Sequence, residues 1–140
     1  MITYKFRGQL CETGEWIAGD LIHFKHDVMI LPLDANWYDF MPWENNPLRL
    51  PSDRFVVDPE TVGQFSSLKD KKGREIFAGD ILAVNGVEEK LEVRFVRGVF
   101  AFLWNGDLDN EFPTCSPTHE WAEVVGNIHD NPELMKGGEQ

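Results

Sequence analysis

The feature that most constrains the fold is a short motif that occurs twice. Residues 15–22 read EWIAGDLI and residues 75–82 read EIFAGDIL, so Ala-Gly-Asp stands between two apolar pairs in each copy. Glycine adopts positive φ at no steric cost, and aspartate can accept backbone N–H groups across a turn. We therefore predict that both copies form turns at corners of small sheets, where they serve the architecture. The residues assigned to these turns are Gly19, Asp20, Gly79 and Asp80.

The similarity between the two halves extends beyond this motif. TVGQF (61–65) resembles VVGNI (124–128), so each half closes with Val-Gly, an amide residue and an apolar residue. Self-similarity of this kind is typical of a duplicated structural unit. We predict a degenerate tandem duplication, with a first β-repeat at 1–66 and a second at 67–135 in one compact domain. The tail 136–140 is expected to be disordered.

Strand patterns dominate the second half. LEVRFV (91–96) alternates apolar and polar positions, Arg97-Gly98 can turn the chain, and VFAFLW (99–104) returns with bulky residues. This order predicts a β-hairpin. Helical periodicity is poor nearly everywhere. We therefore predict a mainly β fold with little helix, either small curved sheets or an SH3-like, partly open barrel.

The first half contains an aromatic and Pro-rich segment at 36–51, which is expected to be a loop. Large rings in such a loop can cover the open end of a barrel, contact a partner or a second copy, or stack on a ligand. All three roles stay open, with intramolecular cover favoured. The residues of this possible interaction surface are Trp37, Tyr38, Phe40 and Trp43.

Charge and composition exclude several classes of partner. Thirteen Lys and Arg against 24 Asp and Glu give a formal net charge of −11, which disfavours attraction to nucleic-acid phosphates and anionic lipids. The basic cluster at 69–74 is interrupted by Asp70 and is read as a mixed-charge surface loop. Cys11 and Cys115 lie far apart and predict no disulfide framework. The N-terminus lacks a signal-peptide core and no long apolar run occurs, so a cytoplasmic protein is expected.

Candidate reactive groups have structural explanations that are more plausible. On a strand, His23 and His26 would point to opposite faces, which is wrong for joint metal ligation. Cys115 and His119 are close in sequence only, which is weak evidence for a catalytic pair. Phosphate-binding glycine loops, GxSxG and HExxH are absent from the sequence. We therefore predict no catalytic, metal-binding or cofactor-binding residues and favour a non-enzyme, without closing that question.

Three longer stretches resemble the YopX family of phage and prophage proteins. They are KFRGQLCETGEWIAGDLI (5–22), DPETVGQFSSLKDKKGREIFAGDIL (58–82) and EVVGNIHDNPELM (123–135), and together they cover nearly the whole chain. The chain departs from the family pattern at Ser66-Ser67, where members usually carry Thr-Gly. The resemblance implies a mainly β protein that is encoded by a phage or prophage and works in the bacterial cytoplasm. It implies no activity, cofactor or catalytic residue.

Two functions remain open at this stage. The favoured one is a non-catalytic protein-interaction or self-assembling module, with a host protein, a phage protein or a second copy as its partner. The alternative is an accessory protein of nucleic-acid transactions, either a weak direct binder or an acidic mimic of DNA. A membrane partner is not expected.

Overall fold

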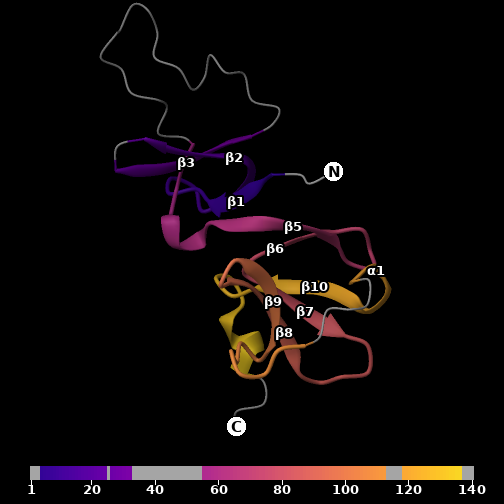
Figure 1. Cartoon of the computed structure of the whole chain (residues 1–140). Helices are drawn as coiled ribbons and strands as arrows, with labels where there is room; N and C mark the ends of the chain where they lie inside the picture. The colour runs from indigo at the N-terminus through magenta and orange to yellow at the C-terminus, as the bar shows by residue number, and fades with distance from the viewer. Residues whose placement is uncertain (1–3, 25, 33–54, 113–117, 137–140) are drawn as a thin grey trace, which may run out of the picture. The chain divides into compact units, whose positions relative to one another are not determined.

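The structure is a computed structural model that describes residues 4–24, 26–32, 55–112 and 118–136. Contacts between Cα atoms divide the chain into two compact units, an N-terminal unit at Tyr4–Gly63 and a C-terminal unit that begins at Gln64. The described residues are mostly in antiparallel strands with a few short helical turns, so the predicted mainly β fold is confirmed (Figure 1). The sheets in this part of the chain stay open, which agrees with small curved sheets.

The N-terminal unit is built on one antiparallel sheet in the order β4-β3-β2-β1. Its core includes the fully buried side chains of Met29, Ile30 and Val57. Asp58 caps the 3-10 helix that follows, because its Oδ1 accepts the Glu60 N–H at 3.0 Å. The elements are β1 (Phe6–Gln9), β2 (Trp16–Phe24), β3 (Asp27–Pro32), β4 (Val56–Val57) and the 3-10 helix η3 (Pro59–Thr61).

The first copy of the Ala-Gly-Asp motif forms no turn. Gly19 and Asp20 lie inside the continuous strand β2, where Gly19 stands opposite Phe6 on one side and Pro32 on the other. A Cβ atom on Gly19 would collide with the backbone carbonyl of Leu31. The sequence prediction is wrong at these two residues because glycine here permits a close approach of strands, not a positive φ.

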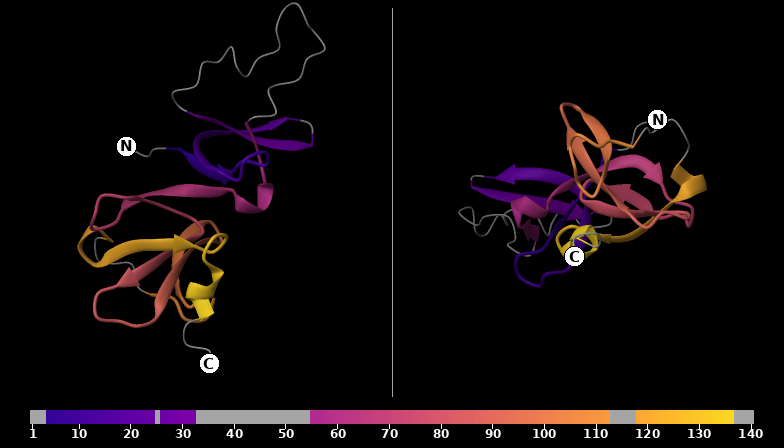
Figure 2. Two further views of the ribbon diagram at one scale, coloured as in Figure 1. Left: turned by 180° about the vertical axis from the view of Figure 1, so that it is seen from behind. Right: turned by 90° about the horizontal axis from the view of Figure 1, so that it is seen from below.

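The C-terminal unit contains a second antiparallel sheet, in the order β10-β7-β8-β9, and the hairpin β5–β6. The 3-10 helix η4 lies against β8 (Figure 2). Since η4 includes Lys136, the predicted disordered tail begins inside this helix, and 137–140 lie outside the described residues. The elements are β5 (Gly63–Lys69), β6 (Glu75–Phe77), β7 (Asp80–Val84), β8 (Lys90–Val96), β9 (Val99–Trp104), α1 (Thr118–Trp121), β10 (Ala122–Asn127) and η4 (Pro132–Lys136).

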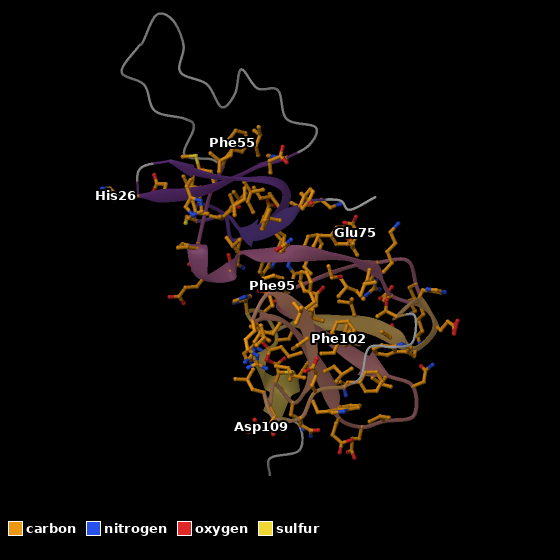
Figure 3. The ribbon with its side chains drawn as sticks, in the orientation of Figure 1. His26, Phe55, Glu75, Phe95, Phe102 and Asp109 are labelled. Atoms are coloured by element: carbon orange, nitrogen blue, oxygen red, sulfur yellow. The ribbon has the colours of Figure 1, made fainter. Side chains whose placement is uncertain are left out.

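The predicted β8–β9 hairpin is confirmed. Its strands pair from Leu91 opposite Trp104 to Val96 opposite Val99, and the turn between them has positive φ at Arg97 and Gly98. One face of the sheet packs on a hydrophobic core, in which the Phe102 side chain is fully buried (Figure 3). The other core members are Ile76, Leu82, Leu91, Val93 and Ala122.

The second copy of the motif does turn the chain. β6 ends at Phe77, Gly79 has φ +98°, and β7 begins at Asp80. The two copies therefore have different backbones: one is a straight strand and the other is a strand-turn-strand. The shared letters do not mark a shared local structure, so the tandem duplication stays a prediction from sequence.

Ser67 lies at an irregular point of β5 and has φ +69°, a conformation that costs a non-glycine residue free energy. Its side chain is exposed. The neighbouring Ser66 is different, because its Oγ donates to the Ile76 carbonyl at 2.7 Å and accepts the Leu68 N–H at 3.1 Å. The strain at Ser67 explains why a glycine suits this position.

We predict that Ser67→Gly raises the free energy of unfolding by about 0.5–1 kcal/mol, because relief of the positive-φ strain exceeds the added chain entropy of glycine. Denaturant unfolding followed by circular dichroism measures the change. Ser66→Gly is the matched control and should destabilise the chain, since it removes two hydrogen bonds. A Ser67→Gly protein no more stable than wild type would contradict the prediction.

Candidate binding site

A concave site among the described residues lies at one end of the β8–β9 hairpin. It is a cavity of about 330 Å³, which is within the range of small-ligand sites. Figure 3 labels Phe95 near one end of this hairpin and Asp109, in the loop that follows β9, near the other. The residues that line the cavity are Val87, Glu89, Trp104, Asn105 and Asn110.

One wall of the cavity is the loop that follows β9. Asn105 and Gly106 both have positive φ, which reverses the chain directly after Trp104. The loop is closed at its base, since the Trp104 N–H donates to the Asn110 carbonyl at 3.0 Å and the Asp107 N–H donates to the Trp104 carbonyl at 2.9 Å. These backbone hydrogen bonds hold Asn105 and Asn110 in place before any ligand arrives.

The opposite wall is the connection between β7 and β8. Gly86 turns the chain with φ +76°, and the Val87 N–H donates to the Val84 carbonyl at 3.1 Å. The two walls are joined directly, because the Asn105 N–H donates to the Lys90 carbonyl at 2.9 Å. Glu89 is thereby held beside the loop that follows β9.

Trp104 is the cavity's aromatic wall and is anchored from behind. Its ring meets Phe112 edge-on, with centroids 5.5 Å apart, and Phe112 in turn packs against Trp121 at 4.8 Å. Trp121 contacts the core residue Phe102 at 5.9 Å. A continuous set of rings therefore fixes the half-buried Trp104 side chain between the core and the cavity.

The surroundings of the cavity are acidic. Its two loops carry five exposed carboxylates, and the Lys90 ammonium donates to the Glu88 carbonyl at 3.0 Å. The lining can stack on a flat group, exchange hydrogen bonds through two amides and attract positive charge. None of the five lining residues is a histidine or a hydroxyl or thiol nucleophile. The exposed carboxylates are Glu88, Glu89, Asp107, Asp109 and Glu111.

The two acids of the repeated motif are in unlike environments. Asp80 is 1% exposed, and its Oδ2 accepts the Phe77 N–H at 2.8 Å, which braces the turn at Gly79. Asp20 is exposed on β2 in the other unit. The structure thus gives Asp80 an architectural role and gives Asp20 none of that kind.

The other residues considered from the sequence do not form a reactive cluster in the described part of the chain. His23, His26 and His119 are exposed, as is the free thiol of Cys11, while Cys115 lies outside the described residues. The described residues include no group of three or more His, Cys, Asp or Glu placed to hold a metal ion.

The predicted aromatic surface falls outside the part of the chain that the structure describes. Trp37, Tyr38, Phe40 and Trp43 all lie outside the described residues. Sequence reasoning instead missed Trp104, which it assigned only to a strand. A signal was present, because Trp104 is followed at once by Asn-Gly and an acidic loop, but only the pairing of β8 with β9 brings Glu89 to it.

The basic cluster at 69–74 forms local contacts with acids and amides. Lys72 Nζ lies 3.1 Å from a Glu123 carboxylate oxygen and lowers the pKa of Glu123, while Lys71 Nζ donates to Asn85 Oδ1 at 2.7 Å. Arg74 donates to the Val124 carbonyl at 2.9 Å. These contacts agree with the predicted mixed-charge surface loop.

Asp70 was also missed as a structural residue. Its side chain is 1% exposed and accepts three backbone N–H groups, from Lys72 and Arg74 at its own turn and from Val124 of β10. Burial raises the pKa of Asp70, but these N–H groups and the Arg74 charge outweigh it, so the pKa is lowered. Asp70 therefore ties the β5–β6 turn to the second sheet as a carboxylate.

These features define a mainly β protein with two small antiparallel sheets and an open, acidic, aromatic cavity. The chain belongs to the family described as YopX protein, whose model matches residues 5–136. Among solved structures, it is similar to the crystal structure of protein EF1440 from Enterococcus faecalis. The identity is 21%, the match covers 96% of this chain and 99% of that one, and the TM-score is 0.51, which shows a shared fold. The search of curated proteins gives no match.

Across the residues that the structure describes, every helix is too short or too polar to cross a bilayer.

We predict that Asp80→Ala destabilises the C-terminal unit by about 1–3 kcal/mol, because the buried Phe77 N–H loses its acceptor. Asp20→Ala is the matched control, since it changes the corresponding letter of the motif at an exposed site, and should stay within about 0.5 kcal/mol of wild type. Urea unfolding of both variants measures the difference. Equal losses in the two variants would contradict the assignment.

We predict that Asp70 contributes stability at neutral pH that is lost in acid. The folded-state pKa of Asp70 is lowered, so its contribution is present above the unfolded value of about 4 and declines as the pH falls through the folded value. Asp70→Asn should unfold more easily at pH 7, because the amide N–H₂ that replaces one carboxylate oxygen donates and cannot accept a backbone N–H group. Urea unfolding across pH 2–7 should show the two proteins converging in acid; a constant difference would contradict the linkage.

Proposed function

We propose that this YopX-family protein is a non-catalytic protein-interaction module, and that its C-terminal unit binds a partner protein through the cavity at Trp104. The observation that carries the proposal is a tryptophan ring fixed at the wall of a cavity whose loops are closed by backbone hydrogen bonds. Tryptophan in a pocket is among the residues that most often dominate the energy of protein interfaces.

The preformed loops support binding in a second way. Association loses affinity when side chains and loops must be ordered on contact. Here backbone hydrogen bonds already order the cavity walls, at Asn105, Asp107 and Asn110. The ring of Phe112 also limits the motion of Trp104. A partner's side chain can then enter with little further ordering of this protein.

The proposal includes the origin and the place of action. Membership of the YopX family and the acidic sequence support a protein encoded by a phage or prophage that acts in the bacterial cytoplasm. The partner is a host or phage protein. Self-association through the same cavity is the second possibility, and it would appear as a concentration-dependent mass in sedimentation.

No specific observation among the described residues favours the alternative role in nucleic-acid transactions. Direct contact with phosphates needs available cations on one face. In the basic cluster at 69–74, Lys71 and Lys72 lie at Glu123, and Arg74 donates to a backbone carbonyl.

We predict that replacement of Trp104 removes the partner. The full chain, immobilised and exposed to lysate of a bacterial host, should capture a protein that Trp104→Ala fails to capture. The purified partner should bind Trp104→Ala at least about tenfold more weakly in calorimetry, as expected for a central aromatic anchor.

The matched control is Phe95→Ser, which alters a large, 48% exposed ring at the opposite end of the same hairpin. It should bind like wild type. Circular dichroism of each variant checks that the fold is retained. Full retention of every captured protein by a folded Trp104→Ala would contradict the proposal.

A further inference from the structure

The proposed function leaves open which chemical group enters the cavity. We infer, on the basis of that function, that the cavity at Trp104 takes an arginine side chain of the partner protein. The Trp104 ring favours a flat group, and the negative charge of the cavity walls favours a cation.

The ring favours a flat cation. A guanidinium group placed over the face of tryptophan is attracted by the ring quadrupole and also stacks on it. This protein contains the same pairing in its N-terminal unit, where the Arg7 guanidinium lies 4.9 Å from the centroid of the Trp16 ring. Within the described part of the chain, the ring contact of Trp104 is with Phe112, and the five residues that line the cavity include no cation.

The charge of the walls selects a cation over an anion. Glu89 lines the cavity, and four further exposed carboxylates follow or precede the lining residues in the same two loops. A phosphate or carboxylate group would be repelled by this field, while a cation would be drawn to it and held more weakly as salt rises. Two cations lie beside these loops, and each is already engaged. Lys90, the first residue of β8, donates to the Glu88 carbonyl, and Arg94 is paired with Glu92 at 2.7 Å while it donates to the Gly106 carbonyl at 3.4 Å.

The amides favour arginine over lysine. Asn105 and Asn110 line the cavity together with Glu89 and offer side-chain oxygens as acceptors. Guanidinium presents five N–H donors in a rigid plane, so it can stack on Trp104 and donate to several acceptors at once. An ammonium group has no plane to stack and keeps its water more tightly. A neutral sugar could stack but would leave the carboxylates unused.

The test uses small probes on the full chain. The indole N–H signal of Trp104, assigned by Trp104→Phe, is followed by NMR during titration with acetyl-Gly-Arg-Gly-amide. The same peptide with citrulline, which keeps the shape and removes the charge, is the matched probe. The arginine peptide should bind about tenfold more tightly than the citrulline peptide at low salt, and the preference should shrink at high salt.

Variants locate the effect. Glu89→Gln should weaken arginine binding at least about threefold while leaving citrulline binding unchanged, since only the charge at the wall is lost. Glu60→Gln removes an exposed carboxylate of the N-terminal unit and should change neither. Equal affinity for the two peptides, or a Trp104 shift on titration with a neutral disaccharide and none with the arginine peptide, would overturn the inference.

The partner identified by capture separates this inference from the proposed function. If Trp104→Ala loses the partner but Glu89→Gln and high salt do not, the protein-binding function stands and the arginine inference falls. If a folded Trp104→Ala keeps the partner, the proposed function falls. Loss in both variants, together with arginine selectivity of the peptides, supports both.

Discussion

The antiparallel pairing of β8 with β9 is the interaction on which the C-terminal unit depends. Its register puts Leu91 opposite Trp104, so one set of side chains enters the core while the strand ends bring two loops together. The Asn105 N–H then closes those loops on Lys90. The pairing of β8 with β9 therefore determines both the core packing and the candidate site, because Trp104, whose ring lines the cavity, is the last residue of β9.

Buried carboxylates hold the rest of this unit together. Asp70 accepts N–H groups from its own turn and from β10, and Asp80 accepts the N–H of Phe77 beside the glycine turn. Each replaces a backbone pairing that the sheet cannot supply at a bend, which satisfies groups that would otherwise be costly to bury. Acidic residues thus have two roles in this unit. Buried aspartates stabilise the turns, and exposed carboxylates give the cavity a negative electrostatic potential.

How much the sequence could predict depended on how local the signal was. The hairpin at 90–104 was predictable because alternation and the Arg97-Gly98 turn act over a few residues. The Ala-Gly-Asp motif forms the predicted turn only in the second copy, where the chain turns at Gly79 between β6 and β7. At Gly19 the same letters continue a strand, because two neighbouring strands pair with it along its length, and no local rule reports such neighbours.

The sequence by itself determined the mainly β class, the acidic character and the family. These follow from the alternation of apolar and polar residues, from the composition and from the extended motifs. Only the tertiary structure decided which aspartate is buried, and it alone joined Trp104 to Glu89 in one cavity. The physical reason is that burial and cross-strand proximity come from residues distant in the chain, whereas strand propensity and charge are carried by each residue where it stands.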